Sequence, residues 1–177
     1  MRRPPPVRAP RADLAAPNAT ITEREDVSSS VARFRIRPDD GVPAFEPGQY
    51  LALGLEVDGR ALQRPYSTAS ARGETDSLEF LVRLVPDGAL TPRLWPLGVG
   101  DRVRLGRPKG LFTAGATEAR RPVYVATGTG IAPLLSMLES RLREAEDGPS
   151  HRRPIVLHGV ARAEDLAWRS RFEAARR

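Results

Sequence analysis

The chain has 177 residues, room for one large domain or two small ones, and 40% of them are hydrophobic, enough for a packed core. It contains no cysteine, which excludes disulfide bonds and iron–sulfur clusters held by its own thiolates. No segment approaches the roughly 18 apolar residues of a membrane span, and no secretory signal follows the start. We therefore expect a cytoplasmic protein with no membrane anchor and no metal site.

A net charge of +6 is typical of nucleic-acid-binding proteins, but the positions of the charged residues argue against that function here. Residues 1–17 carry four arginines and one acidic residue, residues 166–177 carry the same excess, and the sequence between them is balanced. That middle part lacks the combination of basic and aromatic side chains on which bases stack. No nucleic-acid partner is expected.

The opening sequence, MRRPPPVRAPRADLAAP, is of low complexity, and its prolines prevent a regular helix or a paired strand. We expect a disordered tail at 1–17. Folded structure is expected from residue 18 onward.

Residues 18–118 carry a period of two. Apolar and arginine side chains alternate along 32–37, and alternation of the same kind recurs in 78–84 and 102–105. Turn sequences rich in Gly, Pro and Asp separate these runs. About six short strands at this spacing predict a small antiparallel barrel or sandwich. One interruption, at 90–97, predicts a short helix with Thr91 as its N-cap and Pro92 as its first helical residue.

The pattern of residues 119–177 is that of an α/β unit. An apolar strand is predicted at 122–126, an amphipathic helix at 131–142, a second strand at 154–158 and a second helix at 163–175. A doubly wound nucleotide-binding domain usually has about five or six strands. We therefore expect 119–177 to form the N-terminal part of such a domain.

Two short motifs carry the chemistry. Arg64-Pro65-Tyr66-Ser67 offers a positive charge, an aromatic surface and a hydroxyl on one strand, as a flavin requires for its phosphates, its ring and its N5 atom. An ordinary strand with a buried tyrosine is the alternative. Gly128-Thr129-Gly130 lies between a predicted strand and a predicted helix, where glycines let a dinucleotide pyrophosphate approach the start of the helix.

In this order, and with Gly48-Gln49-Tyr50 upstream, the motifs resemble the ferredoxin/flavodoxin–NADP+ reductase family, in particular its bacterial members. The resemblance runs from about Asn18 to the end of the chain. It implies a flavin-binding antiparallel Greek-key β-barrel at 18–118, followed at 119–177 by an NADP-binding α/β domain that is truncated. The family's later strands, and its C-G-x-P segment beside the nicotinamide, have no counterpart here.

The resemblance also implies roles for individual residues. Tyr66 would stack on the flavin ring and Ser67 would bond near N5, so these two are the expected catalytic residues, while Arg64 would meet the pyrophosphate. Thr129 would lie near the contact of flavin and nicotinamide, and Arg162, one residue later than the family's arginine, would contact NADP. The expected cofactor-binding residues are Arg64, Pro65, Tyr66, Ser67, Leu81, Val82, Arg83, Leu84, Ala89, Leu90, Thr91, Gly128, Thr129, Gly130 and Arg162.

The implied function is electron transfer between NADP(H) and ferredoxin or flavodoxin through bound FAD. Two alternatives stay open at this point. One is a flavin-binding electron relay or remnant module that NADPH does not reduce, and the other is an all-β binding domain without a cofactor. The incomplete parallel sheet would also leave an exposed edge, which favours pairing or aggregation.

Overall fold

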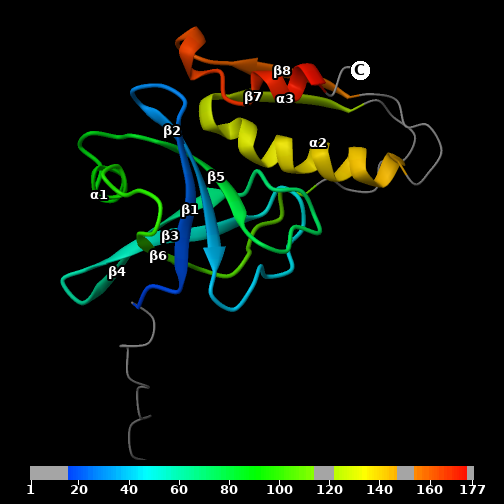
Figure 1. The fold of residues 1–177 in the computed structure, drawn as a ribbon. Coiled ribbons are helices and arrows are strands. Elements are labelled where there is room, and N and C mark those ends of the chain that lie inside the picture. The colour runs from blue at the N-terminus through cyan, green and yellow to red at the C-terminus, as the bar shows by residue number, and fades with distance from the viewer. Residues whose placement is uncertain (1–15, 114–121, 147–153, 175–177) are drawn as a thin grey trace, which may run out of the picture.

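The computed structural model describes residues 16–113, 122–146 and 154–174 (Figure 1). The expected tail at 1–17 falls almost entirely on residues 1–15, and the expected domain boundary at 118 and 119 falls within 114–121. Both therefore lie outside the described residues. No described helix is long and apolar enough to cross a membrane.

Six strands form one antiparallel sheet, in the order β4-β3-β6-β1-β2-β5. The alternation of apolar and polar residues predicted this sheet correctly, because side chains two residues apart share a face and one face is buried. The strands are β1 (Ala19–Asp26), β2 (Val31–Pro38), β3 (Tyr50–Val57), β4 (Arg60–Ser67), β5 (Leu78–Arg83) and β6 (Arg102–Leu105).

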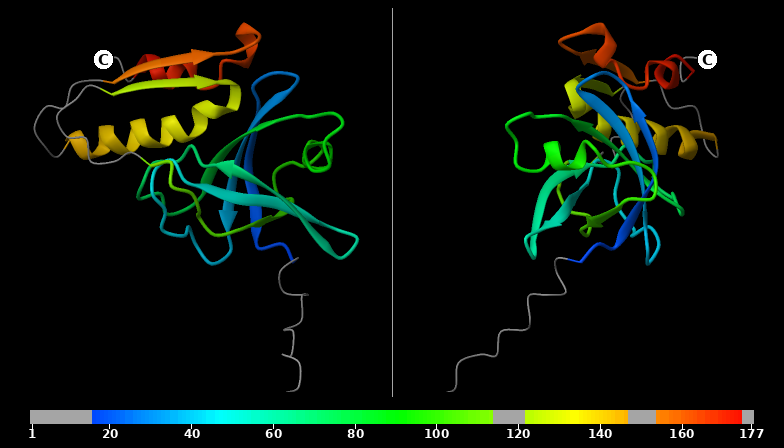
Figure 2. Two further views of the ribbon diagram at one scale, coloured as in Figure 1. Left: turned by 180° about the vertical axis from the view of Figure 1, so that it is seen from behind. Right: turned by 60° about the vertical axis from the view of Figure 1, so that its left-hand side comes forward.

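The sheet curls into a barrel-like form (Figure 2). Its two edges meet at a bridge between Thr68, just after β4, and Phe80 of β5. The inner face is packed with fully buried side chains, and the expected antiparallel barrel is confirmed at this level, whereas its Greek-key connection stays a prediction. The largest fully buried side chains of this core are those of Phe80, Ile21, Ile36, Leu51, Leu53, Leu78, Leu90, Leu94 and Val82.

The short helix α1 (Thr91–Leu94) covers one end of the barrel with Leu90 and Leu94. The prediction that Thr91 is its N-cap is wrong, because Leu90 occupies that position and no side chain caps the helix. The Thr91 hydroxyl is used elsewhere. It accepts the Val85 N–H at 2.9 Å and donates to the Val85 carbonyl at 3.1 Å, which closes the loop that precedes the helix.

The second part of the chain begins as a parallel α/β unit. β7 (Val123–Thr127) is followed by a 3-10 turn at Gly128–Gly130, by α2 (Ile131–Glu146) and by β8 (Ile155–Gly159), which pairs with β7 in parallel. The predicted helix at 163–175 is wrong in part: a 3-10 turn at Ala163–Asp165 and α3 (Arg169–Ala174) are separate. The interruption includes Trp168, whose φ of 57° lies in the left-handed region and ends any helix there.

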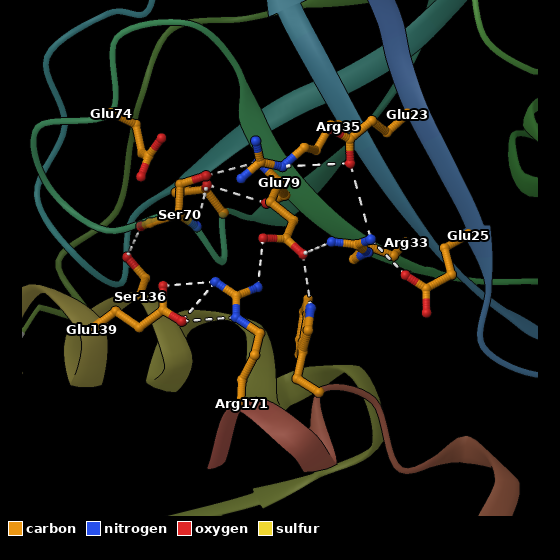
Figure 3. A network of polar contacts seen from close by, with 12 residues as sticks. Glu23, Glu25, Arg33, Arg35, Ser70, Glu74, Glu79, Ser136, Glu139 and Arg171 are labelled. Atoms are coloured by element: carbon orange, nitrogen blue, oxygen red, sulfur yellow. Dashed lines mark hydrogen bonds and ion pairs between the residues drawn. The ribbon is translucent and has the colours of Figure 1, made fainter. Parts of the chain in front are cut away.

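A buried carboxylate joins the two parts (Figure 3). Glu79 of β5 is 1% exposed and accepts hydrogen bonds from Arg33 of β2 at 3.1 Å and from Arg171 of α3 at 2.8 Å. The indole N–H of Trp168 donates to the same carboxylate at 2.8 Å. Arg171 also pairs with Glu139 of α2 at 2.6 Å. One barrel side chain thereby holds α3 directly and α2 through Arg171.

We predict that Glu79→Gln lowers the free energy of unfolding by about 3 kcal/mol at pH 7, because breaking a buried ion pair leaves uncompensated charge. Burial alone would raise the pKa of Glu79, but Arg171, Trp168 and Arg33 outweigh it and hold that pKa below its ordinary value. The stabilisation is therefore complete above the pKa of the unfolded carboxyl, about 4.5, and declines as the pH falls below it.

Urea unfolding of wild type and Glu79→Gln between pH 3 and 8 checks this prediction. The difference between the two proteins should shrink below about pH 4.5. Glu56→Gln is the matched control, since Glu56 is an exposed carboxylate on β3, and it should change stability by less than about 0.5 kcal/mol. A pH-independent difference would contradict the charged role of Glu79.

The outer face of the two-stranded sheet is apolar and exposed. Val123 and Val125 of β7, 55% and 69% exposed, pair in register with Ile155 and Leu157 of β8, 36% and 54% exposed. The inner face packs against α2, which lies between this sheet and the barrel (Figure 1). Parallel sheets are normally covered on both faces. We therefore expect this face to promote self-association.

The double substitution Val125→Thr with Leu157→Thr tests that expectation. Because both side chains are more than half exposed, it should lower the free energy of unfolding by less than about 1 kcal/mol while reducing self-association. Sedimentation velocity over a range of concentrations measures the second effect. Leu135→Thr is the contrasting control: Leu135 is 1% exposed, and its loss should cost about 2–4 kcal/mol. Unchanged sedimentation of the double variant would contradict the expectation.

Candidate functional site

The barrel-like sheet is open along one side. β4 and β5 are its edge strands, and among the described residues they are bridged only from Thr68 to Phe80. Continuing the antiparallel register past this bridge sets Ser67 opposite Leu81 and Arg64 opposite Leu84. In that extrapolated register, the two groups of residues expected to bind a flavin, 64–67 and 81–84, would lie on the two edges that border the opening.

The side chains of β4 are arranged by its pairing with β3. Arg64 and Tyr66 lie opposite Leu53 and Leu51, which are buried, so both belong to the core-facing side of the strand. Tyr66 is half-buried against the barrel core, and burial raises the pKa of its phenol despite the opposing charge of Arg64. Arg64 itself is exposed, and its guanidinium donates to the Gln63 carbonyl at 2.8 Å. A neutral aromatic ring and an exposed positive charge thus lie two residues apart.

The other two residues of the motif on β4 are Pro65 and Ser67. Pro65 is exposed and lies opposite Ala52, on the other side of the strand. Ser67 ends β4 and is half-buried. Ser67 directly precedes Thr68, whose bridge to Phe80 closes one end of the opening.

On β5, at the opposite edge, the expected flavin-binding residues differ in their exposure. Leu81 and Val82 are buried, so a ligand in the opening would meet their main chain only, whereas Arg83 is exposed and Leu84 half-buried. In the following loop Ala89 is exposed, but Leu90 and Thr91 are buried. The loop is tight: a Cβ on Gly88 would lie 3.0 Å from the Val85 carbonyl oxygen.

The glycine turn lies at the carboxyl ends of the parallel strands, where open α/β sheets bind their ligands. Gly128 has a φ of 52°, in the left-handed region that favours glycine. The turn leads directly into α2, in the strand–turn–helix context that the sequence predicted. His158 fixes it from the neighbouring strand, with Nε2 at 2.9 Å from the Gly128 carbonyl oxygen.

The two parts of the chain share one surface depression. β5 contributes Leu81 and Arg83, and the glycine turn contributes Gly128 and Thr129. A Cβ on Gly128 would lie 4.0 Å from Arg83 Nη1, so the barrel arginine reaches the turn. The structure thus brings together expected cofactor-binding residues that are about 45 positions apart in the sequence. The depression is completed by Val31, Val160, Ala161 and Asp165.

Arg162 does not line this depression. Its exposed side chain pairs with Glu164 at 3.7 Å, while Val160 and Ala161, just before it, form part of the wall. The sequence interpretation did not include these two residues. Their position directly after the second parallel strand was the signal that could have found them. Among the described residues, no cluster of His, Asp and Glu side chains could hold a metal ion.

Comparison with protein families agrees with this division of the chain. A family model described as an oxidoreductase FAD-binding domain matches residues 18–113, and one described as an oxidoreductase NAD-binding domain matches residues 124–177. A ferredoxin–NADP reductase of Pseudomonas aeruginosa is 40% identical over 126 residues, which are 70% of this chain and 47% of that protein. The chain belongs to the ferredoxin–NADP+ reductase family.

Other members of the family extend the comparison. A flavodoxin/ferredoxin–NADP reductase of Escherichia coli is 34% identical over 77% of this chain and 54% of its own length. A Neisseria gonorrhoeae ferredoxin NADP+ reductase structure with bound FAD and NADP superposes with a TM-score of 0.73, at 27% identity, over 89% of this chain and 62% of that one. The chain spans about half the length of the curated relatives it matches first.

The residues around the opening fit FAD. A dinucleotide flavin presents a flat ring, a hydrogen-bonding edge and two phosphates. The strands that border the opening carry Tyr66, whose phenol is neutral, Ser67, and the exposed arginines Arg64 and Arg83. Gly88 has no Cβ, which would let a phosphate approach the main chain of the loop.

We predict that Arg64→Ala weakens FAD binding about tenfold or more, because charge-assisted hydrogen bonds contribute about 1.5–3 kcal/mol each. Folding should be unaffected, since Arg64 is exposed and its one hydrogen bond to the described residues is to the neighbouring Gln63 carbonyl. Arg60→Ala is the matched control, an exposed arginine on the same strand. Titration of apoprotein with FAD, followed by quenching of flavin fluorescence, measures the affinities. Equal affinities for the two variants would contradict the role of Arg64.

Proposed function

We propose that the chain binds FAD in the opening between β4 and β5 and transfers electrons between NADP(H) and ferredoxin or flavodoxin. Bound FAD would take up a hydride from NADPH and a proton from solvent, and would release the two electrons singly to two acceptor molecules. The observation that carries the proposal is that β5 borders both the opening and the depression beside Gly128. A flavin and a nicotinamide would therefore approach each other at one strand.

The flavin side of the proposal assigns one task to each β4 residue. Tyr66 would provide the flat surface for the ring, as a phenol that burial keeps neutral. Ser67 would hydrogen-bond near N5, and Arg64 would neutralise phosphate charge, as its exposure allows. Ala89, Leu90 and Thr91 would act through their main chain, since the Thr91 hydroxyl is already bonded to Val85.

The nicotinamide side uses the start of α2. The 16-residue helix begins directly after the glycine turn, and the positive end of its dipole favours a pyrophosphate there. Gly128 and Gly130 would let the phosphates approach the main chain, and Thr129 would lie between the two cofactors. Arg83 supports this arrangement as a positive charge beside Gly128. Arg162 remains a proposed NADP contact from the exposed loop after β8.

The described residues contain less of the nicotinamide side than of the flavin side. It spans about half of its curated relatives, and the described parallel sheet has two strands. Hydride transfer requires the reacting atoms to be held close together and aligned. We therefore expect FAD to bind more strongly than NADPH. A flavin module that NADPH does not reduce is the alternative outcome.

The proposed partner is a ferredoxin or flavodoxin of acidic character. The basic excess of residues 1–17 and 166–177 would attract such a carrier over distances of about 10 Å. The attraction should weaken as salt is added. A cytoplasmic location for this exchange stays a prediction.

An anaerobic titration of the FAD-loaded chain with NADPH tests the proposal. Loss of the visible flavin absorbance at about one NADPH per flavin is the expected result, because one hydride carries two electrons. Bleaching by dithionite but not by NADPH would leave the flavin site intact and overturn the reductase activity of this chain. A protein that remains colourless after addition of FAD would overturn both.

Gly128→Ala ties the reaction to the glycine turn. Alanine at a φ of 52° costs about 1 kcal/mol, so the NADPH concentration for half reduction should rise about fivefold, while dithionite reduction is unchanged. Gly41→Ala is the matched control: Gly41 has a φ of 81° and, like Gly128, open space around its missing Cβ, but it lies in the turn after β2. Equal effects of the two variants would contradict the assignment of the turn.

A further inference from the structure

Arg24 is a charged residue on the core-facing side of a barrel strand. It lies on β1 directly opposite Phe34, a core residue that is 2% exposed, and its own side chain is 18% exposed. The guanidinium group lies over two aromatic rings, 5.4 Å from the centroid of Phe34 and 5.3 Å from that of Trp95. A buried charge in such a place requires partners for its N–H groups.

The partners are the carbonyl groups that follow helix α1. Arg24 Nη1 donates to the main-chain oxygen of Trp95 and, at 2.7 Å, to that of Leu97. Nε and Nη2 donate to Asp26 Oδ1 at 2.9 and 2.8 Å, which fixes the plane of the guanidinium. One side chain of β1 therefore fastens the segment after α1 to the barrel by hydrogen bonds and by stacking.

Because Arg24 holds the segment after α1, the loop before α1 is held as well. The helix is one turn long, with the N–H of Leu94 bonded to the Leu90 carbonyl at 3.0 Å and that of Trp95 bonded to the Thr91 carbonyl at 2.9 Å. Thr91 in turn closes the loop by its two bonds to Val85. The contacts run without a gap from Arg24 through Trp95 and Thr91 to the 85–91 loop.

We propose that Arg24 is a positioning residue for the flavin phosphates: it touches no cofactor but holds the 85–91 loop in the conformation that receives them. The inference rests on the proposed flavin site. It adds a residue to that site from the opposite side of α1, where no cofactor-binding motif lies. The ligand chemistry concerned is the phosphate part of the flavin, not the isoalloxazine ring.

A planar guanidinium is required for this task. Lysine carries its three N–H donors on one compact nitrogen and lacks the flat surface with which the guanidinium lies over the two rings. Methionine keeps the apolar stem that packs on Phe34 and Trp95 but donates no hydrogen bond. Arg24→Lys should therefore retain part of the function, and Arg24→Met should lose it.

The experiment compares dissociation constants for FAD, FMN and riboflavin, measured by flavin fluorescence on apoprotein of wild type, Arg24→Met and Arg24→Lys. In Arg24→Met the constants for FAD and FMN should rise about tenfold, equivalent to the loss of one charge-assisted hydrogen bond. The constant for riboflavin, which has no phosphate, should change less than about twofold. Arg24→Lys should lie between wild type and Arg24→Met.

Arg102→Met is the matched control, because Arg102 of β6 makes a comparable set of bonds, to Thr20, Asp39 and the Pro17 carbonyl, and none of these is to α1. It should leave all three constants within about twofold of wild type. Equal losses for riboflavin and FAD in Arg24→Met would reduce Arg24 to a general structural role and overturn the inference. If Arg24→Met does not fold, the same comparison in Arg24→Lys decides. Failure of wild type to bind any flavin would overturn the proposed function, and this inference with it.

Discussion

The arrangement of the two parts depends on one buried carboxylate. Glu79 is enclosed by the barrel, the segment before α3 and α3 itself, and it is stabilised there by two guanidinium groups and an indole N–H. The pairing is reciprocal, because the partly buried guanidinium of Arg171 bonds both Glu79 and Glu139. Buried charges of this kind are costly unless their partners are in place. The contact is therefore specific for one relative position of barrel and α/β unit, which an apolar patch alone would not impose.

The same strand that carries this contact carries most of the site. Side chains alternate along β5, so Phe80 and Val82 enter the barrel core while Glu79, Leu81 and Arg83 face the α/β unit. Its free edge borders the opening toward β4. The six residues of β5 thus contribute to the barrel core, to the junction of the two parts and to the place where the proposed cofactors would meet. A shift of this strand by one position would exchange its two faces and disrupt all three.

The sequence predicted well those elements whose formation depends mainly on neighbouring residues. Alternation located β2, β5 and β6, and the turn sequences between such runs predicted about six strands; the change to helical spacing then located α2 between β7 and β8. It failed at Thr91 and at Leu166–Trp168, where a side-chain hydrogen bond that no motif encodes decides the outcome. Thr91 is bonded to Val85, and Trp168 turns toward Glu79, which is 89 residues away. For the same reason Arg24 and the Glu79 network could not be read from any motif.

We expect the affinity for FAD and the affinity for NADPH to depend on different parts of this chain. The proposed flavin site is built on a barrel with a complete core, and its expected contacts belong to strands and loops that the core holds directly. The proposed nicotinamide site rests on two parallel strands with one bare face. Its only described support is α2, α3 and their contacts with the barrel, including the ion pairs of Arg171. We therefore expect FAD affinity to depend on the barrel. We expect NADPH affinity to depend on the junction between the barrel and the α/β unit and on the covering of the outer face of β7 and β8.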